Sequence, residues 1–268
     1  MQNKVVVITG ATSGIGKALA YEFTAQGAKV VIGARTYDKL VEIAADIKSK
    51  GGEIAYVQTD ISKEEDCKNL ILTAVEMFGK IDILINNAGI SMRALFADTQ
   101  IHVIETLMNV NFWGTVYCTK YALPHILKEK GSVVAVSSIA GLIGLPGRIG
   151  YAASKFAING FMESLRTENL KTGLHVLMAF PGFTASNIRN TALASDGSKQ
   201  GESPRAEEKM MSAERVAQEI YLAIQKRKNK IILTTQGKSM VLVNKYFPNW
   251  LSRKIFQVMA KEPGSPFK

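Results

Sequence analysis

Cysteine and histidine are scarce in this sequence. The 268 residues include two cysteines, Cys67 and Cys118, and three histidines. Two cysteines are too few for a disulfide framework, and no spacing of cysteine and histidine resembles a zinc site. We therefore expect both cysteines to be buried apolar side chains in a reducing compartment, and we expect a site without metal.

Long apolar runs are also missing. No stretch approaches the roughly 18 apolar residues that a membrane-spanning helix needs. The opening residues, MQNKVVVITG, lead at once into a strand-like run, without the apolar segment and cleavage site of a signal peptide. These absences predict a cytoplasmic protein that does not cross a bilayer.

Acidic residues are nearly absent from the C-terminal part. The sequence holds 33 Lys and Arg against 23 Asp and Glu, and ten of the basic residues but only one acid, Glu262, lie between positions 226 and 268. The preceding part of the chain is therefore almost neutral, and the excess positive charge belongs to the tail.

Seven short runs rich in β-branched residues alternate with segments of helical periodicity. Each run is apolar along almost its whole length, as in parallel strands that are covered on both faces. In the segment 62–79, Ser62 and Glu65 have the spacing of a capping box and Gly79 marks a helix end. The pattern predicts an α/β fold, a Rossmann-like doubly wound parallel sheet of about seven strands with helices on both faces. The strands are expected at 4–9, 29–34, 54–59, 81–86, 132–138, 175–180 and 230–235.

A glycine-rich turn, TGATSGIG at 9–16, joins the first predicted strand to a helix. Gly10, Gly14 and Gly16 let the backbone turn sharply and approach a pyrophosphate, whose charge then lies at the helix N-terminus. The spacing differs from the more usual GxGxxG, and glycines in such a turn also have purely steric uses. We predict a dinucleotide site here, with further contacts from Thr12, Ser13 and Ile15.

The next strands indicate which dinucleotide is bound. Arg35 follows the second strand, at the place where an acidic residue would bind an adenosine ribose. A cation suits a 2′-phosphate, so NADP(H) is preferred over NAD(H), and the alternative is an ordinary solvated arginine. Asp60, after the third strand, can bind the adenine amino group or begin the next helix, and Ile61 follows it. The fourth strand ends at the ligand-binding edge of such a sheet, which adds Asn87, Ala88 and Gly89.

Tyr151 and Lys155 are four residues apart in a segment with a helical pattern, so both side chains lie on one helix face. Such a pair is usually inert when the face is exposed. A free tyrosine has a pKa of about 10, and a neighbouring ammonium lowers this pKa toward the range in which the phenol can donate and recover a proton. Ser138 ends the fifth strand at the same edge, where its hydroxyl can bind a substrate oxygen or cap a turn.

Together these motifs resemble the short-chain dehydrogenase/reductase family, over nearly all of residues 4–235. Each motif alone is a weak signal, but their order and spacing are very specific. The resemblance implies an NADP(H)-dependent oxidoreductase without a metal, assembled as a homodimer or homotetramer. It rests on TGATSGIG at 9–16, NNAG at 86–89, Asn111 in NVNFWG, Ser138, the pair of Tyr151 and Lys155, and PG at 181–182.

The resemblance also implies a role for each residue. Tyr151 is expected to be the general acid in carbonyl reduction and the general base in alcohol oxidation. Lys155 is expected to lower the pKa of Tyr151 and to hold the nicotinamide ribose. Ser138 is expected to orient the carbonyl oxygen, and Asn111 to keep a water in a proton relay that ends at Lys155. The hydride passes between nicotinamide and substrate carbon, so the protein supplies positioning and the proton.

The sequence departs from the family pattern after Pro181 and Gly182, which are expected to line the cofactor site. Family members commonly have a threonine four residues beyond this glycine, where it binds the nicotinamide carboxamide. Here Ser186 occupies that position and Thr184 lies two residues earlier. Either hydroxyl can serve, and the sequence leaves the choice open.

The loops that vary with function in this family predict an apolar substrate pocket. The stretch 183–194 is expected to form a short lid helix within a substrate loop at about 183–212. No cluster for a phosphate or carboxylate is evident, so we expect a small lipophilic ketone, aldehyde or secondary alcohol. The expected wall residues are Met92, Leu95, Leu142, Ile143, Leu145, Phe183, Ile188 and Leu193.

The catalytic domain is expected to span 1–236, followed by a basic amphipathic tail at 237–268. Apolar residues recur in the tail near helical spacing beside lysines and arginines, and Pro248 is expected to kink or start a helix. The stretch 238–261 therefore suits the surface of an anionic membrane, and packing on the protein's own core or on a partner subunit are the alternatives. Nucleic acid is not an expected partner, because no aromatic stacking platform accompanies the basic residues.

Three other functions fit parts of the sequence. A basic surface can dock an acidic carrier protein, as a reductase similar to 3-oxoacyl-carrier-protein reductases would require. A cofactor-sensing protein without turnover is a second possibility, but a sensor does not need the complete set of Ser138, Tyr151 and Lys155. A membrane-peripheral scaffold that uses its tail is the third.

Overall fold

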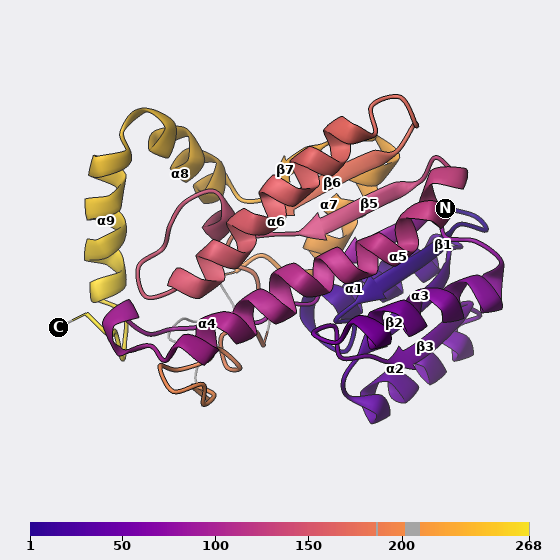
Figure 1. Ribbon diagram of the computed structural model, residues 1–268, viewed down its shortest axis with the longest axis horizontal. Helices are drawn as coiled ribbons and strands as arrows, with labels where there is room; N and C mark the ends of the chain where they lie inside the picture. The colour runs from indigo at the N-terminus through magenta and orange to yellow at the C-terminus, as the bar shows by residue number, and fades with distance from the viewer. Residues whose placement is uncertain (186, 202–209, 268) are drawn as a thin grey trace.

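The computed structural model describes residues 1–185, 187–201 and 210–267 (Figure 1). Ser186 and part of the predicted substrate loop, residues 202–209, lie outside the described residues. The strands are β1 (Val5–Thr9), β2 (Lys29–Ala34), β3 (Ile54–Gln58), β4 (Ile83–Asn86), β5 (Ser132–Val136), β6 (His175–Phe180) and β7 (Lys230–Ile232). All are parallel, in the order β3-β2-β1-β4-β5-β6-β7, and each lies inside the run that predicted it. The predicted Rossmann-like sheet is confirmed.

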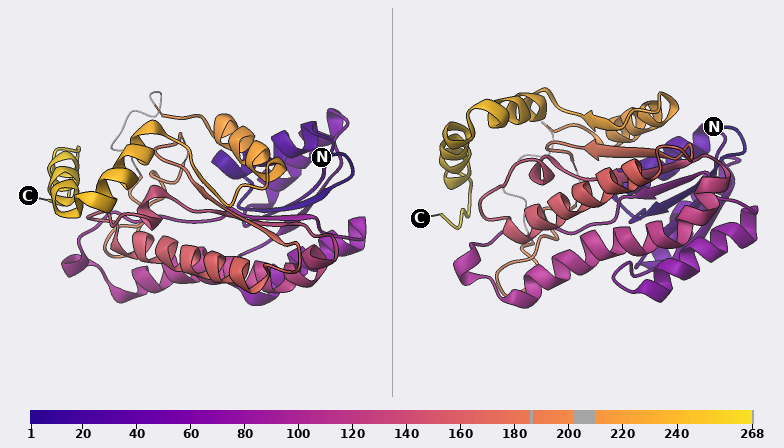
Figure 2. Two further views of the ribbon diagram at one scale, coloured as in Figure 1. Left: turned by 90° about the horizontal axis from the view of Figure 1, so that it is seen from above. Right: turned by 45° about the horizontal axis from the view of Figure 1, so that its top comes forward.

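Helices cover both faces of the sheet, as predicted (Figure 2). They are α1 (Gly14–Ala25), α2 (Tyr37–Ser49), α3 (Glu64–Phe78), α4 (Ile101–Leu107), α5 (Gly114–Lys128), α6 (Ile149–Glu168), α7 (Ala213–Gln225), α8 (Thr235–Tyr246) and α9 (Pro248–Ala260). One core lies under α1, α2 and α7, and a second under α3, α5 and α6. Successive residues of β1 alternate between them, with Val6 and Ile8 in the first core and Val7 in the second. Cys67 and Cys118 are free and buried in the second core, as expected.

The start of α3 differs from the predicted capping box of Ser62 and Glu65. The helix begins at Glu64, and the residue before it makes no side-chain cap. The backbone N–H and the hydroxyl of Ser62 both donate to the carboxylate of Asp60, at 3.1 and 2.7 Å. Ser62 therefore bonds to the Asp60 carboxylate instead of capping the helix. The predicted end is correct, because Gly79 closes α3 with a φ of 77°.

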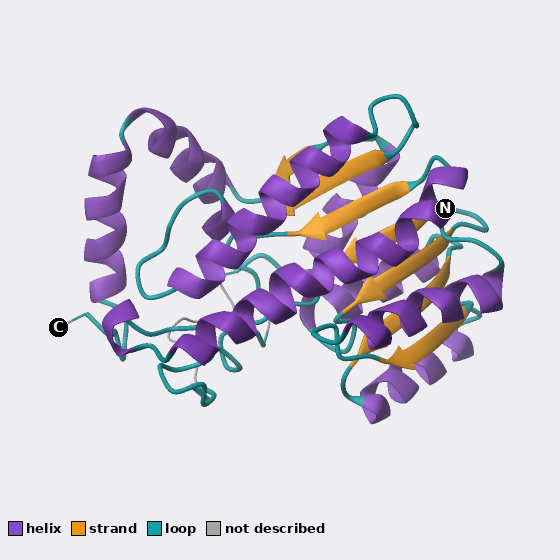
Figure 3. Ribbon diagram, viewed as in Figure 1, coloured by secondary structure: helices purple, strands orange, loops and turns teal. Residues whose placement is uncertain are grey.

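The loops gather at the carboxyl ends of the strands (Figure 3). A parallel sheet with helices on both faces leaves this edge open, and ligands of such sheets bind there. In this protein α8 and α9 stand beyond the same edge, at the end of the molecule opposite the N-terminus (Figure 1). The chain therefore places its C-terminal helices over the edge at which a site is expected.

The tail forms two helices joined at Pro248, which is the first residue of α9, as expected. α8 begins at Thr235, just before the predicted start of the tail at 237. Leu251, Ile255 and Met259 recur at every fourth position of α9, and all three are buried against the second core. Within the described residues, no helix has the length and apolar character to span a membrane.

Candidate functional site

A cavity of about 800 Å³ lies at the carboxyl edge of the sheet and extends from the glycine-rich turn to α9. The structure brings nearly all of the predicted site residues to its wall. Gly16 and Asn111 lie outside the lining, and Ser186 lies outside the described residues. The predicted residues that line it are Gly10, Thr12, Ser13, Gly14, Ile15, Arg35, Asp60, Ile61, Asn87, Ala88, Gly89, Ser138, Tyr151, Lys155, Pro181, Gly182 and Thr184.

The glycine-rich turn is a close contact between two loops. Gly10 has a φ of 68°, and a Cβ atom there would lie 2.7 Å from the backbone Cα of Ala88. A Cβ atom on Gly16 would collide with the carbonyl oxygen of Gly10, so this glycine has a packing role. Ser13 makes no side-chain cap at the start of α1, which leaves the first N–H groups of that helix available at the cavity.

The NNAG segment is tied to the same turn by Thr9, which the sequence analysis did not single out. The Thr9 hydroxyl accepts from the backbone N–H groups of Asn87 and Ala88, at 3.0 and 3.1 Å. The amide of Asn87 donates in return to the carbonyl oxygens of Thr9 and Gly10, at 2.9 and 3.2 Å. The second asparagine of the motif therefore fixes the shape of the turn.

Positive charge lies at the β2 end of the cavity. Arg35 is exposed at the tip of β2, and Lys39 on α2 also lines the wall, although the sequence analysis did not name it. Burial raises the pKa of Asp60, but the hydrogen bonds from Ser62 and the charge of Arg35 outweigh it, so the pKa falls below its ordinary value. The turn, the free helix N-terminus and these cations fit a dinucleotide that carries phosphate groups.

Ser138, Tyr151 and Lys155 meet at the next part of the cavity. Ser138 follows β5, its hydroxyl accepts from the N–H of Ala140 at 3.1 Å, and it lies close enough to Tyr151 to lower the pKa of that phenol. Lys155 is 3% exposed, its Nζ donates to the carbonyl oxygen of Val136 at 3.0 Å, and it lies 5.8 Å from the centre of the Tyr151 ring. The predicted pair thus faces the cavity from one side of α6.

Burial shifts the pKa values of both Tyr151 and Lys155. It raises the pKa of Tyr151, an effect that the Ser138 hydroxyl and the charges of Arg148 and Arg189 only partly reverse. It lowers the pKa of Lys155 to about 8, because an ammonium loses its hydration there. Arg148 and Arg189 are therefore part of the electrostatic environment of Tyr151, and the sequence analysis named neither.

Asn111 is completely buried in the irregular helix η2 (Met108–Trp113), which lies between α4 and α5. Its amide oxygen accepts from the N–H of Ile90 at 2.8 Å, and its amide nitrogen donates to the Ser154 hydroxyl at 2.9 Å. A Cβ atom on Gly89 would lie 3.1 Å from the Asn111 side chain and 3.4 Å from Nζ of Lys155. Asn111 and Lys155 therefore flank Gly89 directly beneath the cavity wall.

The comparison with known proteins identifies the family. The profile described as short chain dehydrogenase matches residues 4–196, most of the chain. This protein belongs to the short-chain dehydrogenase family. Members of this family are oxidoreductases, and a solved structure with the same fold is in complex with NAD.

Two relatives show how far the similarity extends. Dehydrogenase/reductase SDR family member 7B of Rattus norvegicus is 38% identical over 267 residues, which cover 97% of this chain and 81% of the rat protein. 11-beta-hydroxysteroid dehydrogenase-like 2 of Arabidopsis thaliana is 42% identical over 187 residues, which cover 69% of this chain and 60% of the plant protein. The chain thus spans less than two thirds of the plant relative.

Solved structures of short-chain dehydrogenases share the fold. A short chain dehydrogenase/reductase from Burkholderia phymatum in complex with NAD superposes with a TM-score of 0.82 at 24% identity, covering 91% of this chain and 93% of that one. An alcohol dehydrogenase from Thermococcus sibiricus, complexed with 5-hydroxy-NADP, gives a TM-score of 0.76 at 23% identity, covering 87% and 96%. Both forms of the cofactor thus occur among structures with this fold.

The segment after Pro181 differs from the lid helix that was predicted for 183–194. Residues 187–191 form turns, with hydrogen bonds from Thr191 N–H to Asn187 and from Ala192 N–H to Arg189. Thr184 is 5% exposed, lies in the cavity wall and donates to the carbonyl oxygen of Gly182 at 3.3 Å. The segment is held by tertiary contacts, which explains why its helical sequence pattern was misleading.

The substrate end of this short-chain dehydrogenase is less apolar than predicted. Leu145, Phe183, Ile188 and Leu193 line the cavity, while Met92, Leu95, Leu142 and Ile143 do not. Further apolar wall residues come from the tail, for which packing on the protein's own core was one of the alternatives: Met240, Leu251, Ile255, Val258 and Met259. No cluster for a phosphate or carboxylate was evident from the sequence, and the structure adds two arginines, Arg148 and Arg189, to the cavity lining.

Proposed function

We propose that the protein is an NADP(H)-dependent oxidoreductase that interconverts a lipophilic ketone or aldehyde and the corresponding alcohol, with Ser138, Tyr151 and Lys155 as its catalytic residues. One observation carries the proposal. Tyr151, whose pKa Ser138 lowers, lines a cavity that also has the glycine-rich turn at one end and apolar side chains of α9 at the other. One cavity can therefore hold the cofactor and a lipophilic substrate beside the proton donor.

The chain's own residues supply the proton and the orientation. When bound, the nicotinamide supplies the hydride for reduction or accepts it in oxidation. Tyr151 donates its proton to the carbonyl oxygen, and the Ser138 hydroxyl holds that oxygen by a hydrogen bond. The ammonium of Lys155 stabilises the phenolate of Tyr151, and Asn111 beside Gly89 supports the path that returns a proton to Lys155. Thr184 is the hydroxyl we assign to the carboxamide.

The test of this function is direct. The purified protein is mixed with NADPH and a panel of alkyl ketones and aldehydes, and the loss of NADPH absorbance is followed. We expect consumption that depends on the ketone and increases with alkyl chain length. Tight NADPH binding without turnover on any member of the panel would favour the cofactor sensor instead.

The preference for NADP(H) is a further part of the proposal and rests on Arg35 and its neighbour Lys39. Replacing Arg35 by Ala is expected to weaken NADPH binding by about tenfold, because a charge-assisted contact with the 2′-phosphate is lost. NADH binding should be unchanged and serves as the internal control in a fluorescence titration. An equal loss for both cofactors would show that Arg35 acts on something other than the 2′-phosphate.

We also propose that residues 238–261 contact an anionic membrane surface. The stripe of Leu251, Ile255 and Met259 is used inside the protein, but other apolar side chains of α8 and α9 face solvent. The exposed ones, with Phe247 at the junction of the two helices, are Leu242 at 61%, Tyr246 at 62%, Phe247 at 65%, Trp250 at 56%, Phe256 at 49% and Val258 at 58%. Five cations share these helices or border them: Lys238, Lys245, Arg253, Lys254 and Lys261. Aromatic side chains among cations are typical of an interfacial helix on anionic lipid.

Changing both Phe247 and Trp250 to Ser should reduce binding to vesicles that contain phosphatidylserine by roughly tenfold or more, because two large apolar side chains no longer enter the interface. Sedimentation of the full chain with vesicles measures the effect, and Leu170→Ser, at an exposed apolar position outside the tail, is the control. If the wild type fails to sediment and the double variant instead changes its oligomeric state, the face belongs to a partner subunit.

Two remaining expectations complete the proposal. We propose that the protein forms a homodimer or homotetramer, as members of the family commonly do. We also propose a cytoplasmic location, supported by two cysteines that are both free and buried, Cys67 and Cys118. Such thiols are ordinary in a reducing compartment.

A further inference from the structure

Arg148 is a cation at the substrate end of the cavity that the proposed reaction does not use. It is the residue before α6, three positions ahead of Tyr151, and its side chain lines the cavity wall. Its Nη1 donates to the hydroxyl of Ser91 at 3.1 Å, and Ser91 is itself buried. Across residues 1–185, 187–201 and 210–267, no other acceptor bonds this side chain and no carboxylate forms an ion pair with it.

This guanidinium is in an unfavourable environment as it stands. Burial lowers its pKa, and the nearby charges of Arg93 and Arg189 act in the same direction, against the opposite influence of Tyr151 and Glu262. An arginine remains protonated in proteins, so the fold holds a partly dehydrated positive charge against a cavity. A buried charge of this kind costs stability unless a counter-charge approaches it.

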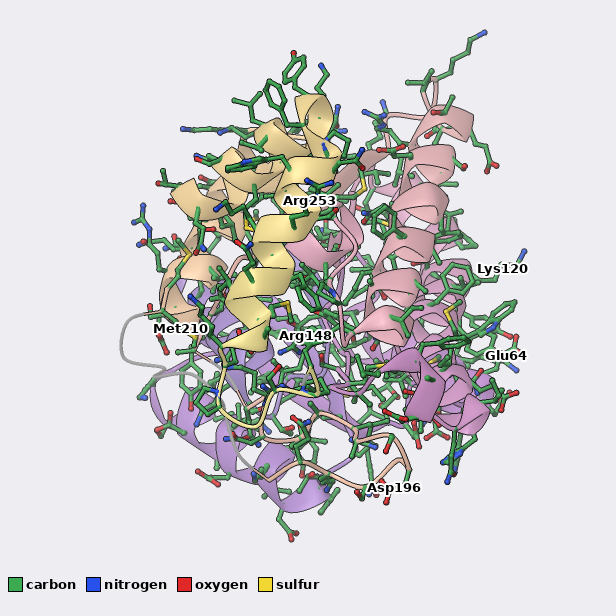
Figure 4. All side chains as sticks on the ribbon, turned by 90° about the vertical axis from the view of Figure 1, so that its left-hand side faces the viewer. Glu64, Lys120, Arg148, Asp196, Met210 and Arg253 are labelled. Carbon is green, nitrogen blue, oxygen red and sulfur yellow. The ribbon has the colours of Figure 1, made fainter. Side chains whose placement is uncertain are left out.

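Within the described residues, Glu262 is the carboxylate whose charge acts on Arg148, but it forms an ion pair with Arg93 rather than with Arg148. Nη2 of Arg93 lies 3.6 Å from Oε2 of Glu262 and also donates to the carbonyl oxygen of Pro263 at 2.8 Å. Arg189 is 6% exposed, donates to the carbonyl oxygen of Thr184 at 2.9 Å and lines the cavity as well. Figure 4 shows Arg148 near the C-terminal end of α9, where these groups meet.

We propose that Arg148 binds an anionic group, a phosphate or a carboxylate, on the ketone substrate, and that Arg189 adds a second positive charge to this subsite. The inference deepens the proposed function and rests on it. The fork of N–H groups on a guanidinium matches the oxygens of either anion, and an anion would offset the charge that burial leaves uncompensated.

The position of Arg148 limits the shape of the substrate. It lies three residues before Tyr151, both residues line the cavity, and its charge acts on the Tyr151 phenol, so we place the anionic group near the carbonyl. Leu145 and Ile188 line the same cavity, and Ile255 and Met259 of α9 do so from the tail. The substrate class is therefore an amphiphilic ketone, with an alkyl chain on one side of the carbonyl and an anion on the other.

Arg148 could instead act on the reaction only through Tyr151, whose pKa its charge lowers. That role predicts an equal loss of kcat for charged and neutral ketones, with an altered pH dependence of the rate. A binding role predicts a rise in KM that is confined to charged ketones. The two are therefore separated by comparing matched substrates.

The first experiment needs no turnover. Octyl phosphate and octanol are titrated into the protein with bound NADP⁺ and followed by calorimetry. Arg148→Met should weaken octyl phosphate binding by about ten- to a hundredfold and leave octanol unchanged, because hydrogen bonds to a charged group are lost. Arg148→Lys should recover part of the affinity. Arg166→Met removes the same charge from the far end of α6 and should change neither.

The second experiment uses two pairs of ketones. One pair is a long-chain ketone with a phosphate ester one carbon from the carbonyl and the same ketone with a methoxy group there. The other is a long-chain 4-oxo carboxylate and its methyl ester. The wild type should have a lower KM for the anionic member of at least one pair, and Arg148→Met should abolish that difference in KM.

The outcomes separate the two proposals. If the ketones are reduced but charge gives no advantage, and octyl phosphate binds Arg148→Met as well as the wild type, the anion subsite is wrong and the reductase stands. If octyl phosphate binding depends on Arg148 but no ketone is reduced, the anion subsite stands and the proposed reaction is wrong. An equal fall in kcat for every ketone would assign Arg148 to the tuning of Tyr151.

Discussion

Tyr151→Phe is expected to lower kcat for ketone reduction by about 10²–10⁴-fold while NADPH still binds, the range typical of a lost general acid. Only the hydroxyl is removed, and this is the group whose pKa Ser138 lowers at the cavity wall. The ring keeps its place in the apolar cluster with Met92 and Leu107. Steady-state kinetics with a saturating ketone measure kcat, and an NADPH titration of the variant measures cofactor binding.

The matched control is Tyr121→Phe. This change also removes a phenol hydroxyl, one that donates to Glu64 on α3 at 2.7 Å, and neither Tyr121 nor Glu64 lines the cavity. It should leave kcat unchanged. A similar fall in both variants would mean that the loss reflects stability rather than proton transfer, and an active Tyr151→Phe enzyme would remove Tyr151 from the mechanism.

Lys155→Met should have opposite effects on activity and on stability. We expect kcat to fall by roughly a hundredfold or more, because the charge that assists Tyr151 is lost. We also expect the cofactor-free protein to become more stable. Burial lowers the pKa of Lys155 from its ordinary 10.5 to about 8, so the folded state holds the ammonium at a cost. At neutral pH that cost is roughly 3 kcal/mol, or an increase of about 5–10 °C in Tm for the variant.

The pH dependence follows from the sign of this shift. Below pH 8 the lysine is protonated in both the folded and the unfolded states, so the full cost is present. As the pH rises from about 8 toward 10.5, the folded state releases the proton first and the cost disappears. The advantage of Lys155→Met in thermal unfolding should therefore be greatest at neutral pH and shrink in alkali. Lys120→Met, at an exposed position of α5, should show no such gain, and a destabilised Lys155→Met would contradict the account.

The strands of the sheet could be predicted from the sequence because each strand is recognisable from its own residues. A strand buried on both faces is apolar throughout, so the runs around Val6, Val31 and Leu84 identify strands without any knowledge of their neighbours. The start of α3 could not be predicted in the same way. Ser62 has two possible partners, and the choice of Asp60 over the helix depends on how β3 leads into the turn.

The cofactor end of the site was also within reach of sequence reasoning, since its residues sit in short motifs that end consecutive strands. The substrate end was not. Arg148 resembles any arginine at the start of a helix, and its importance appears only when α9 closes over it from a distant part of the chain. The spacing of Leu251, Ile255 and Met259 was the one signal that could have placed the tail against the cavity.

The central claim is that the cavity around Tyr151 carries out NADPH-dependent carbonyl reduction. It is tested most directly by incubating the protein with a long-chain ketone and NADPH in which both hydrogens at the nicotinamide C4 are deuterium, followed by mass spectrometry of the product. The account predicts an alcohol with deuterium on the former carbonyl carbon from the wild type and almost none from Tyr151→Phe. Unlabelled alcohol, no alcohol from a protein that binds NADPH tightly, or equal labelling by Tyr151→Phe would contradict it.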